Sequence, residues 1–133
     1  MITQCIHFQG NCDEAINFYK KALKAEVKEI SYAKDAPVGS GMDELPPNYV
    51  MYSDITMYGT KFMLSDGGEA PLPYGSFSFM IILETENEVK VVFEKLSTYG
   101  KITQPLSEQF FSSLYGEVID PYGVTWQVMI RHE

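Results

Sequence analysis

Apolar and polar residues alternate along four short segments in the first half of the chain, and this period of two predicts strands. The segments are residues 2–8, 27–33, 49–57 and 61–65. The last two flank Tyr58-Gly59, which predicts a hairpin. Residues 34–48 contain three prolines and two glycines, so we expect a loop there that gates a binding site.

A helix is predicted between the first two strands, because apolar side chains recur there at helical spacing. They are Ala15, Phe18, Tyr19, Ala22 and Leu23. Asn11 followed by Glu14 resembles a capping box, which predicts that the helix begins directly after Asn11.

The second half repeats this order of elements. Residues 77–84 predict a buried strand, and Thr85 with Glu88 forms a capping box before a helix that Gly100 ends. Val89, Val92, Phe93 and Leu96 give that helix its apolar face. Three strands are then expected at residues 101–105, 114–119 and 124–130.

The two halves also share a sequence repeat. The stretch from Tyr58 to Leu64 aligns with the stretch from Tyr122 to Val128, and Asp120-Pro121 precedes the second copy. We therefore predict an α+β fold of two βαβββ modules, residues 1–66 and 75–133, joined by a linker at 67–74. We expect the modules to form a half-open eight-stranded barrel with a ligand cavity between them.

Alternation also predicts which side chains face that cavity. Ile6 and Phe8 are expected on the helix side of the first strand, which leaves Thr3, Cys5 and His7 on the other side. In the last strand Trp126 and Val128 are expected under the helix. Thr125, Gln127 and Met129 would then line the cavity.

Composition narrows the possible partners. The 133 residues are 45% hydrophobic with a formal charge of −8, which disfavours binding to nucleic acid or to an anionic membrane. No segment has the length of a membrane span and the first residues lack a signal-peptide pattern, so we expect a cytoplasmic protein. Cys5 and Cys12 have neither zinc-type spacing nor the density of a disulfide scaffold, and we expect both to be reduced.

With these features the chain resembles the vicinal oxygen chelate superfamily, which includes glyoxalase I, extradiol dioxygenases and the fosfomycin and bleomycin resistance proteins. The resemblance rests on the repeated βαβββ order, on residues 14–19 and on the closing Asp120-Pro121-Tyr122-Gly123. Residues 8–15, 62–66 and 115–126 resemble the PhnB-like branch in particular.

The resemblance implies a divalent metal held by four side chains, two from each module, on the first and last strands. This chain fills those positions badly, because Met63 and Gln127 occupy the last strands and neither side chain is anionic. On the first strand of the first module the candidates are Thr3 or Gln4, with His7 further along. On the first strand of the second module they are Ser78 and Met80. We therefore predict a degenerate site without a tightly bound metal, although a divalent metal at a rebuilt site remains open.

Two residues are candidates for catalysis. His7 has the chemistry of a general base near neutral pH, and the alternative is a histidine hydrogen-bonded within a half-polar strand. Glu117 shares a strand face with Tyr115, and the alternative is a solvent-facing carboxylate. The other histidine, His132, is expected in a frayed C-terminus. We expect Tyr52, Gln127, Met63, Met80 and Tyr115 to contact the substrate.

The expected function is the binding of a small molecule between the modules, with or without lyase, isomerase or transferase chemistry. The alternative is a non-catalytic protein that sequesters a drug or metabolite, as bleomycin-binding members of the superfamily do. PhnB-like proteins often carry a demethylubiquinone methyltransferase label, but no glycine-rich loop of the common S-adenosylmethionine fold follows a strand here. By the same resemblance we expect a homodimer.

Overall fold

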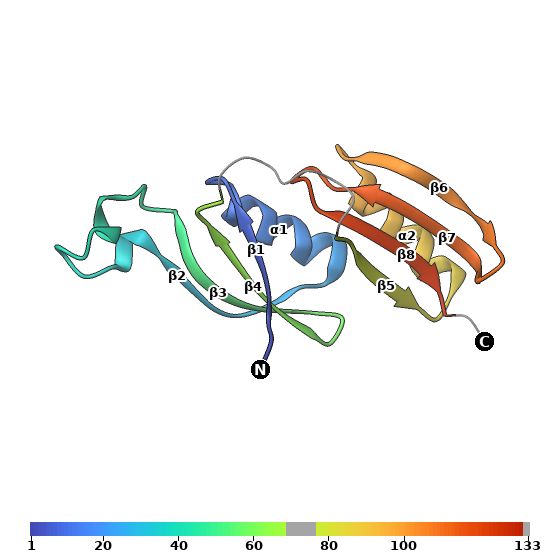
Figure 1. Ribbon diagram of the computed structural model, residues 1–133, viewed down its shortest axis with the longest axis horizontal. Helices are drawn as coiled ribbons and strands as arrows, with labels where there is room; N and C mark the ends of the chain where they lie inside the picture. The colour runs from blue at the N-terminus through green and yellow to red at the C-terminus, as the bar shows by residue number, and fades with distance from the viewer. Residues whose placement is uncertain (69–76, 132–133) are drawn as a thin grey trace. The chain divides into compact units, whose positions relative to one another are not determined.

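Each half of the chain contains one α-helix and four strands in the computed structural model (Figure 1), which confirms the predicted α+β fold and the repeated βαβββ order. The structure describes residues 1–68 and 77–131. Contacts divide the chain into two units, Met1–Pro71 and Leu72–Glu133. Most of the predicted linker, as well as His132, lies outside the described residues. The helices of the described part are too short or too polar to cross a membrane.

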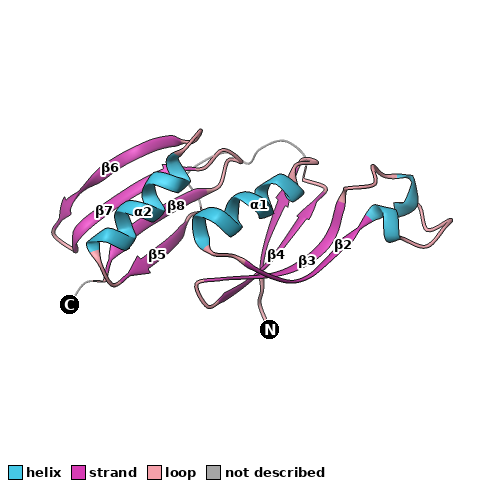
Figure 2. Ribbon diagram, turned by 180° about the vertical axis from the view of Figure 1, so that it is seen from behind, coloured by secondary structure: helices cyan, strands magenta, loops and turns pink. Residues whose placement is uncertain are grey.

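The first unit is a four-stranded sheet with a helix on one face. Its elements are β1 (Gln4–Phe8), α1 (Cys12–Leu23), β2 (Glu26–Tyr32), β3 (Val50–Met57) and β4 (Thr60–Asp66). The strands lie in the order β1-β4-β3-β2, and β1 pairs with β4 in parallel. Figures 1 and 2, taken from opposite sides, show α1 against one face of this sheet. Tyr19, Leu23, Ile55 and Leu64 are fully buried there.

The start of α1 is held by Asp66 and not by the predicted capping box. Asn11 makes no side-chain cap hydrogen bond. Oδ1 of Asp66 accepts hydrogen bonds from the backbone nitrogens of Gly10 (2.9 Å) and Cys12 (3.0 Å), while Oδ2 accepts one from Val50 (2.9 Å). A carboxylate at the first turn of a helix satisfies free N–H groups and favours the helix dipole. Asp66, which directly follows the predicted strand 61–65, is therefore the buried end of β4.

Side chains also join β3 to β4 where regular backbone pairing stops. The paired residues of these strands run from Ile55 opposite Phe62 to Met57 opposite Thr60. Further along, the hydroxyl of Ser53 donates to the carbonyl of Leu64 (2.6 Å) and accepts from its N–H (3.1 Å). Ser53 is fully buried, so its hydroxyl satisfies backbone groups that the other strand no longer reaches.

The predicted loop at residues 34–48 lies between β2 and β3 and contains most of two short 3₁₀ helices, Ala33–Asp35 and Met42–Glu44. Backbone hydrogen bonds close its base, from the N–H of Ala33 to the carbonyl of Tyr49 (2.9 Å) and from Lys34 to Pro47 (3.2 Å). Its proposed gating role stays a prediction.

The second unit repeats this arrangement. Its elements are β5 (Phe79–Leu83), α2 (Glu86–Ser97), β6 (Lys101–Gln109), β7 (Ser112–Ile119) and β8 (Thr125–Ile130). The strand order is β5-β8-β7-β6, with β5 parallel to β8. In Figure 2 α2 lies in front of this sheet and in Figure 1 behind it. The predicted apolar face of α2, Val89, Val92, Phe93 and Leu96, is buried as expected.

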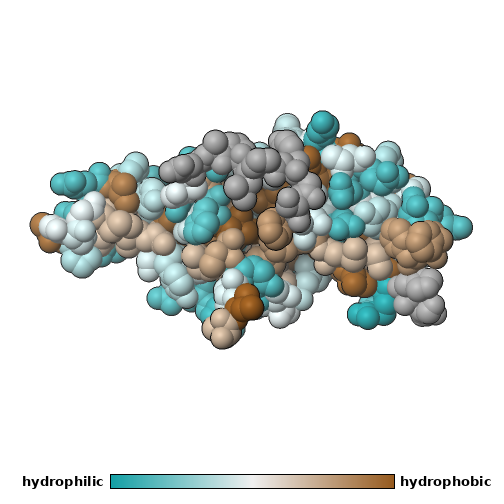
Figure 3. All heavy atoms as spheres, viewed as in Figure 1, coloured by the Kyte–Doolittle hydropathy of each residue, from teal (hydrophilic) through white to brown (hydrophobic). Residues whose placement is uncertain are grey.

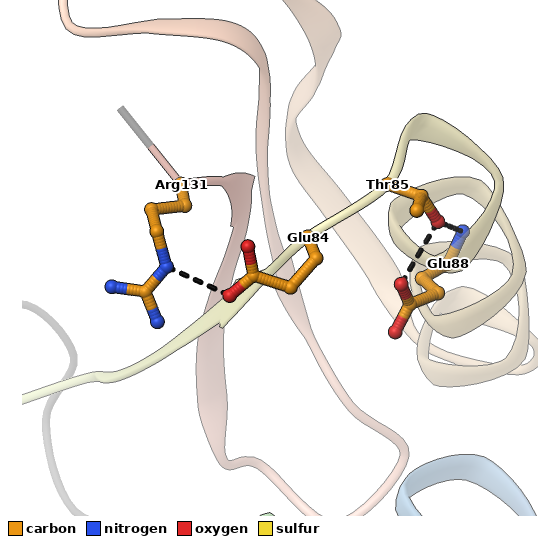
Figure 4. Close-up of polar contacts among 4 residues, drawn as sticks. All are labelled: Glu84, Thr85, Glu88 and Arg131. Carbon is orange, nitrogen blue, oxygen red and sulfur yellow. Dashed lines mark hydrogen bonds and ion pairs between the residues drawn. The ribbon is translucent and has the colours of Figure 1, made fainter. Parts of the chain in front are cut away.

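Thr85 caps α2 as predicted. Its hydroxyl oxygen accepts a hydrogen bond from the backbone nitrogen of Glu88 (3.2 Å) and donates to Oε1 of Glu88 (2.9 Å) (Figure 4). Beside this cap, Arg131 pairs with Glu84 at 2.8 Å. Both partners of that pair are well exposed, so we expect it to contribute less than about 1 kcal/mol.

Gly100 follows α2 for a different reason than the sequence suggested. The left-handed residue after the helix is Tyr99, with φ of 61°, and Gly100 is not among the glycines with positive φ. A Cβ atom at position 100 would lie 2.5 Å from the carbonyl oxygen of Ile119. Glycine is therefore required for a close approach of two backbone segments.

β6 is longer than predicted, because it continues past Pro105 to Gln109. Its pairing with β7 is irregular between Gln104 and Ser107. A proline lacks the N–H that a regular ladder needs, but an edge strand with a shifted register accommodates it.

Strand register confirms the sequence repeat. Phe62 pairs with Gln4 in the first unit and Trp126 pairs with Phe79 in the second, so the aromatic residues of the repeat hold equivalent positions. Gln4 is therefore on the strand face of Phe62, toward the helix, and is no longer a candidate for the other face. The next residues pair Cys5 with Met63 and Met80 with Gln127, which makes these two pairs equivalent.

Asp120 in the Asp-Pro-Tyr-Gly motif organises the turn before β8. Its Oδ1 accepts from the backbone nitrogens of Tyr122 (2.9 Å) and Val124 (3.0 Å), and its Oδ2 accepts from the indole N–H of Trp126 (2.8 Å). Asp120 is only 3% exposed. The motif therefore has a structural role in this chain.

Candidate functional site

The sheet face of the second unit that does not carry α2 presents two short rows of side chains. Alternation along the strands places them there, since Trp126, Val128 and Val118 are buried on the helix face. By register, one row is Met80, Gln127 and Glu117, and the other is Ile82, Met129 and Tyr115. Three neighbouring strands span about 10 Å, and successive rows lie about 7 Å apart. The patch therefore has the size of a small molecule.

A hydrogen-bonded chain crosses this patch. The hydroxyl of Tyr115 donates to Oε1 of Gln127 (2.7 Å), and Nε2 of Gln127 donates to the hydroxyl of Ser78 (2.8 Å). The amide of Gln127 is thus held at both ends, which fixes its orientation. Phe111 contacts the ring of Tyr115 edge to face, with centroids 4.9 Å apart, and so supports the tyrosine.

Glu117 lies beside this chain on β7. Its Oε1 accepts a hydrogen bond from the hydroxyl of Thr103 (2.8 Å). Burial raises the pKa of Tyr115 above its ordinary value, and the negative charge of Glu117 adds to the rise. Tyr115 therefore stays a neutral phenol, able to donate its proton to Gln127, throughout the physiological range.

Hydrophobic side chains accompany the polar ones on this face. Met80 and Ile82 on β5 are 46% and 44% exposed, which is high for apolar strand residues. Figure 3 shows brown, hydrophobic atoms in the region of β5 among teal ones. The face thus combines a few polar groups with apolar surface, as small-molecule sites do.

In the first unit, His7 and Ser65 form a polar pair on the sheet face away from α1. They are register partners on β1 and β4, and Nδ1 of His7 lies 2.9 Å from the hydroxyl of Ser65. Cys5 and Met63, the preceding pair, share that face by alternation. His7 is thus hydrogen-bonded within its strand, and its predicted role as a general base stays a prediction.

Tyr52 and Asp54 occupy the same face on β3. Tyr52 is 40% exposed and pairs with Ser31. Asp54 pairs with Glu29, and its Oδ2 is 3.5 Å from the ammonium of Lys61. The other oxygen, Oδ1 of Asp54, is buried without a hydrogen-bond partner among the described residues. A buried carboxylate oxygen without a hydrogen-bond partner lowers the stability of the fold, so a donor from a ligand or from water would bind favourably at this position.

The structure brings the predicted residues together within each unit. Tyr115, Glu117, Gln127 and Met80 lie on one face of the second sheet, and His7, Met63 and Tyr52 lie on one face of the first. Sequence reasoning missed Ser65, Thr103 and Ile82. Alternation from Met63 and Met80 gives Ser65 and Ile82, whereas Thr103 depends on the irregular register of β6.

The donors on these rows do not fit the metal site that the superfamily implies. Met63 has a soft thioether, and both ends of the Gln127 amide are already hydrogen-bonded. Within residues 1–68 and 77–131, no three His, Cys, Asp or Glu side chains are grouped so that they could hold a metal ion. The predicted lack of a tightly bound metal stays a prediction, which elemental analysis of the purified protein would test.

Two βαβββ units with these strand orders define the class of this protein: the vicinal oxygen chelate fold. The fosfomycin resistance protein FosX from Listeria monocytogenes has the same fold, with a TM-score of 0.70 at 9% identity over 97% of this chain and 91% of that one.

Comparisons with more similar proteins give the family. A family model described as 3-demethylubiquinone-9 3-methyltransferase matches residues 1–129. Protein YjdN from Escherichia coli (strain K12) is 30% identical, over 94% of this chain and 91% of that protein. A solved structure from Bacillus cereus, described as a putative 3-demethylubiquinone-9 3-methyltransferase, PhnB protein, is 31% identical, with a TM-score of 0.81 over 97% of this chain and 98% of that one. The chain belongs to this PhnB-like family.

Proposed function

We propose that this protein binds a small molecule, part polar and part apolar, on the open face of its second sheet. One observation carries the proposal: the chain of hydrogen bonds from Tyr115 through Gln127 to Ser78 lies on the sheet face opposite α2, beside exposed Met80 and Ile82. Polar groups held in fixed orientation within apolar surface are the usual construction of a ligand site.

The arrangement favours binding without a metal. Gln127 stands at the last-strand position that the superfamily uses for a ligand, but its carbonyl oxygen is engaged by Tyr115 and its amide nitrogen by Ser78. This supports a protein that holds or sequesters its ligand. A catalytic role for Glu117 or His7, as general base or acid, stays a prediction that depends first on finding the ligand.

The methyltransferase named in the family description receives no support from the residues of this chain. A single glycine, Gly10, stands between β1 and α1, with φ of 93°, whereas the common S-adenosylmethionine fold uses a glycine-rich loop after a strand. We infer that S-adenosylmethionine is not the ligand. Calorimetric titration that finds saturable binding of S-adenosylmethionine would contradict this inference.

Methionine methyl groups give a direct test of the binding site. The chain has seven methionines. Met63 and Met80 lie on the sheet faces opposite the helices, and Met129 shares the face of Met80 but is only 9% exposed. Met57 is buried on the helix face, and Met42 lies in the loop before β3. With ¹³C-labelled methionine methyls, a library of small fragments should include members that shift the signals of Met80 and Met129 and leave that of Met42 unchanged.

Two variants make this test specific. Gln127→Leu removes both hydrogen bonds of the polar chain, to Tyr115 and to Ser78, and should weaken binding of the fragments found. Val91→Ala alters an exposed apolar residue of α2 and should not. The proposal fails if no fragment perturbs Met80 or Met129, or if Gln127→Leu and Val91→Ala bind equally well.

We propose in addition that the protein is a homodimer. β1, β2, β5 and β6 are edge strands of their sheets, and exposed edges with apolar neighbours such as Ile102, which is 48% exposed, favour association. Light scattering should give twice the monomer mass at micromolar concentration, and a monomer mass there would refute this proposal.

A further inference from the structure

The hydrogen-bonding capacity left over on the open face of the second sheet is mainly that of acceptors. The proton of the Tyr115 hydroxyl goes to Gln127, so the oxygen of Tyr115 retains lone pairs only. The proton of the Thr103 hydroxyl goes to Glu117, which leaves that oxygen an acceptor as well. Gln127 keeps one N–H and Ser78 keeps its hydroxyl proton, and they are the donors that remain in this network.

The charged side chain at the centre of this face is the carboxylate of Glu117. Glu117 is half-buried, and no ion pair joins it to a lysine or arginine of the described chain. The nearest cation by register is Lys101, which is opposite Ile119, two residues along β7 from Glu117. A carboxylate that lies among neutral side chains and has no ion-pair partner attracts a cation, and a donor-only group matches its acceptors.

The second row of side chains offers a hydrophobic surface to the part of the ligand that carries no charge. Ile82, Met129 and Tyr115 form this row, and Tyr115 lies two residues from Glu117 on the same strand face. An apolar skeleton can cover Ile82, which is 44% exposed, while its charged end lies between the ring of Tyr115 and the carboxylate of Glu117. A tyrosine ring and a carboxylate both attract an organic cation.

We propose that the ligand of this site is an organic cation, an ammonium or guanidinium group on an apolar skeleton, with Glu117 as the group that selects the charge. This inference rests on the proposed function, since it names the class of molecule that the same face binds. It assigns Glu117 to recognition, with Thr103 holding the carboxylate in place through its hydrogen bond.

Three probes of similar size and different charge test the inference: 2-phenylethylammonium, 2-phenylethanol and 3-phenylpropanoate. Each is titrated into the protein, and the methyl signals of Met80 and Met129 are followed. The cation should bind about fivefold more tightly than the alcohol, the factor that an exposed ion pair of about 1 kcal/mol gives, and the anion should bind more weakly than both. The preference for the cation should decrease as sodium chloride is added.

Matched variants separate local recognition from overall charge. Glu117→Gln retains the size and a hydrogen bond for Thr103 but removes the charge, so the cation and the alcohol should bind equally. Glu94→Gln removes the same charge from an exposed position on α2 and should retain the preference.

The outcomes for this inference and for the proposed function differ. Equal binding of all three probes at Met80 and Met129 would overturn the inference and leave the small-molecule site intact. A cation preference that survives in Glu117→Gln would also overturn it. Failure of every probe, together with failure of the fragment library to perturb Met80 and Met129, would remove both.

Discussion

Asp66 accepts three backbone hydrogen bonds in the interior of the first unit, and its replacement by asparagine should destabilise the protein strongly. The carboxylate is 5% exposed and binds the N–H groups of Gly10, Cys12 and Val50. Asparagine has one oxygen where aspartate has two, so its NH₂ group must face at least one of these donors. If it faces Val50, which is fully buried, that N–H loses its acceptor, and if it faces Gly10 and Cys12, two N–H groups lose theirs.

The magnitude follows from these contacts. A buried donor left without an acceptor costs about 1–3 kcal/mol, and the remaining two bonds lose the strength that the charge gave them. We expect Asp66→Asn to lower the free energy of unfolding by about 2–4 kcal/mol. Urea unfolding should be followed by far-UV circular dichroism, because the single tryptophan, Trp126, belongs to the second unit and does not report on the first.

Asp43→Asn is a matched control. Asp43 also accepts two backbone hydrogen bonds, from Gly39 and Gly41 at 3.1 Å, but it does so in an exposed loop where water can replace it. We expect a change within about 0.5 kcal/mol. If both variants unfold at the same urea concentration, burial of the Asp66 contacts is not what stabilises the start of α1, and the reasoning fails.

Three further predictions concern single side chains. Thr85→Ala should lower the free energy of unfolding by about 1 kcal/mol through loss of the α2 cap, and Thr85→Ser should restore most of it, as urea melts would show. Burial, together with nearby carboxylates, raises the pKa of the Cys12 thiol, so in the native protein a disulfide reagent should label exposed Cys5 and spare Cys12; equal rates for both would contradict this. A hydrogen bond to Asp13 raises the pKa of Tyr32 to about 12 from 10, so the folded state holds the phenol proton more tightly than the unfolded state does. The free energy of unfolding should therefore fall between pH 10 and 12, and it should fall less in Tyr32→Phe, as urea melts at these pH values would show.

Local patterns in the sequence predicted the elements and their faces well. Val89, Val92, Phe93 and Leu96 repeat at helical spacing because they bury one side of α2, and the alternation around Trp126 gave the face of Gln127 correctly. Thr85 was recognisable as a cap because its partner, Glu88, is three residues away. Such features depend on neighbours in the sequence, so the sequence displays them.

Features that depend on distant partners were missed. Asn11 looked like a cap, but the acceptor for Cys12 is Asp66, which is 54 residues further along the chain. Thr103 reaches Glu117 only through the irregular pairing of β6 with β7, and no local pattern gives the register of an edge strand that contains Pro105. Alternation therefore gave the strand faces of the candidate residues, whereas the contact of Thr103 with Glu117 depends on register and was missed.

The parallel pairing of β1 with β4 bears on how the chain folds during synthesis. β1 leaves the ribosome first, yet its neighbour in the sheet ends at Asp66, so its hydrogen bonds wait until the whole first unit has been made. Contacts of such long sequence separation slow folding. The elements α1, β2 and β3 are close in sequence, and we expect them to pack together before β1 pairs with β4. An unpaired β1 and its apolar side chains are then available to chaperones, or to other nascent chains, for the seconds that translation of one unit takes.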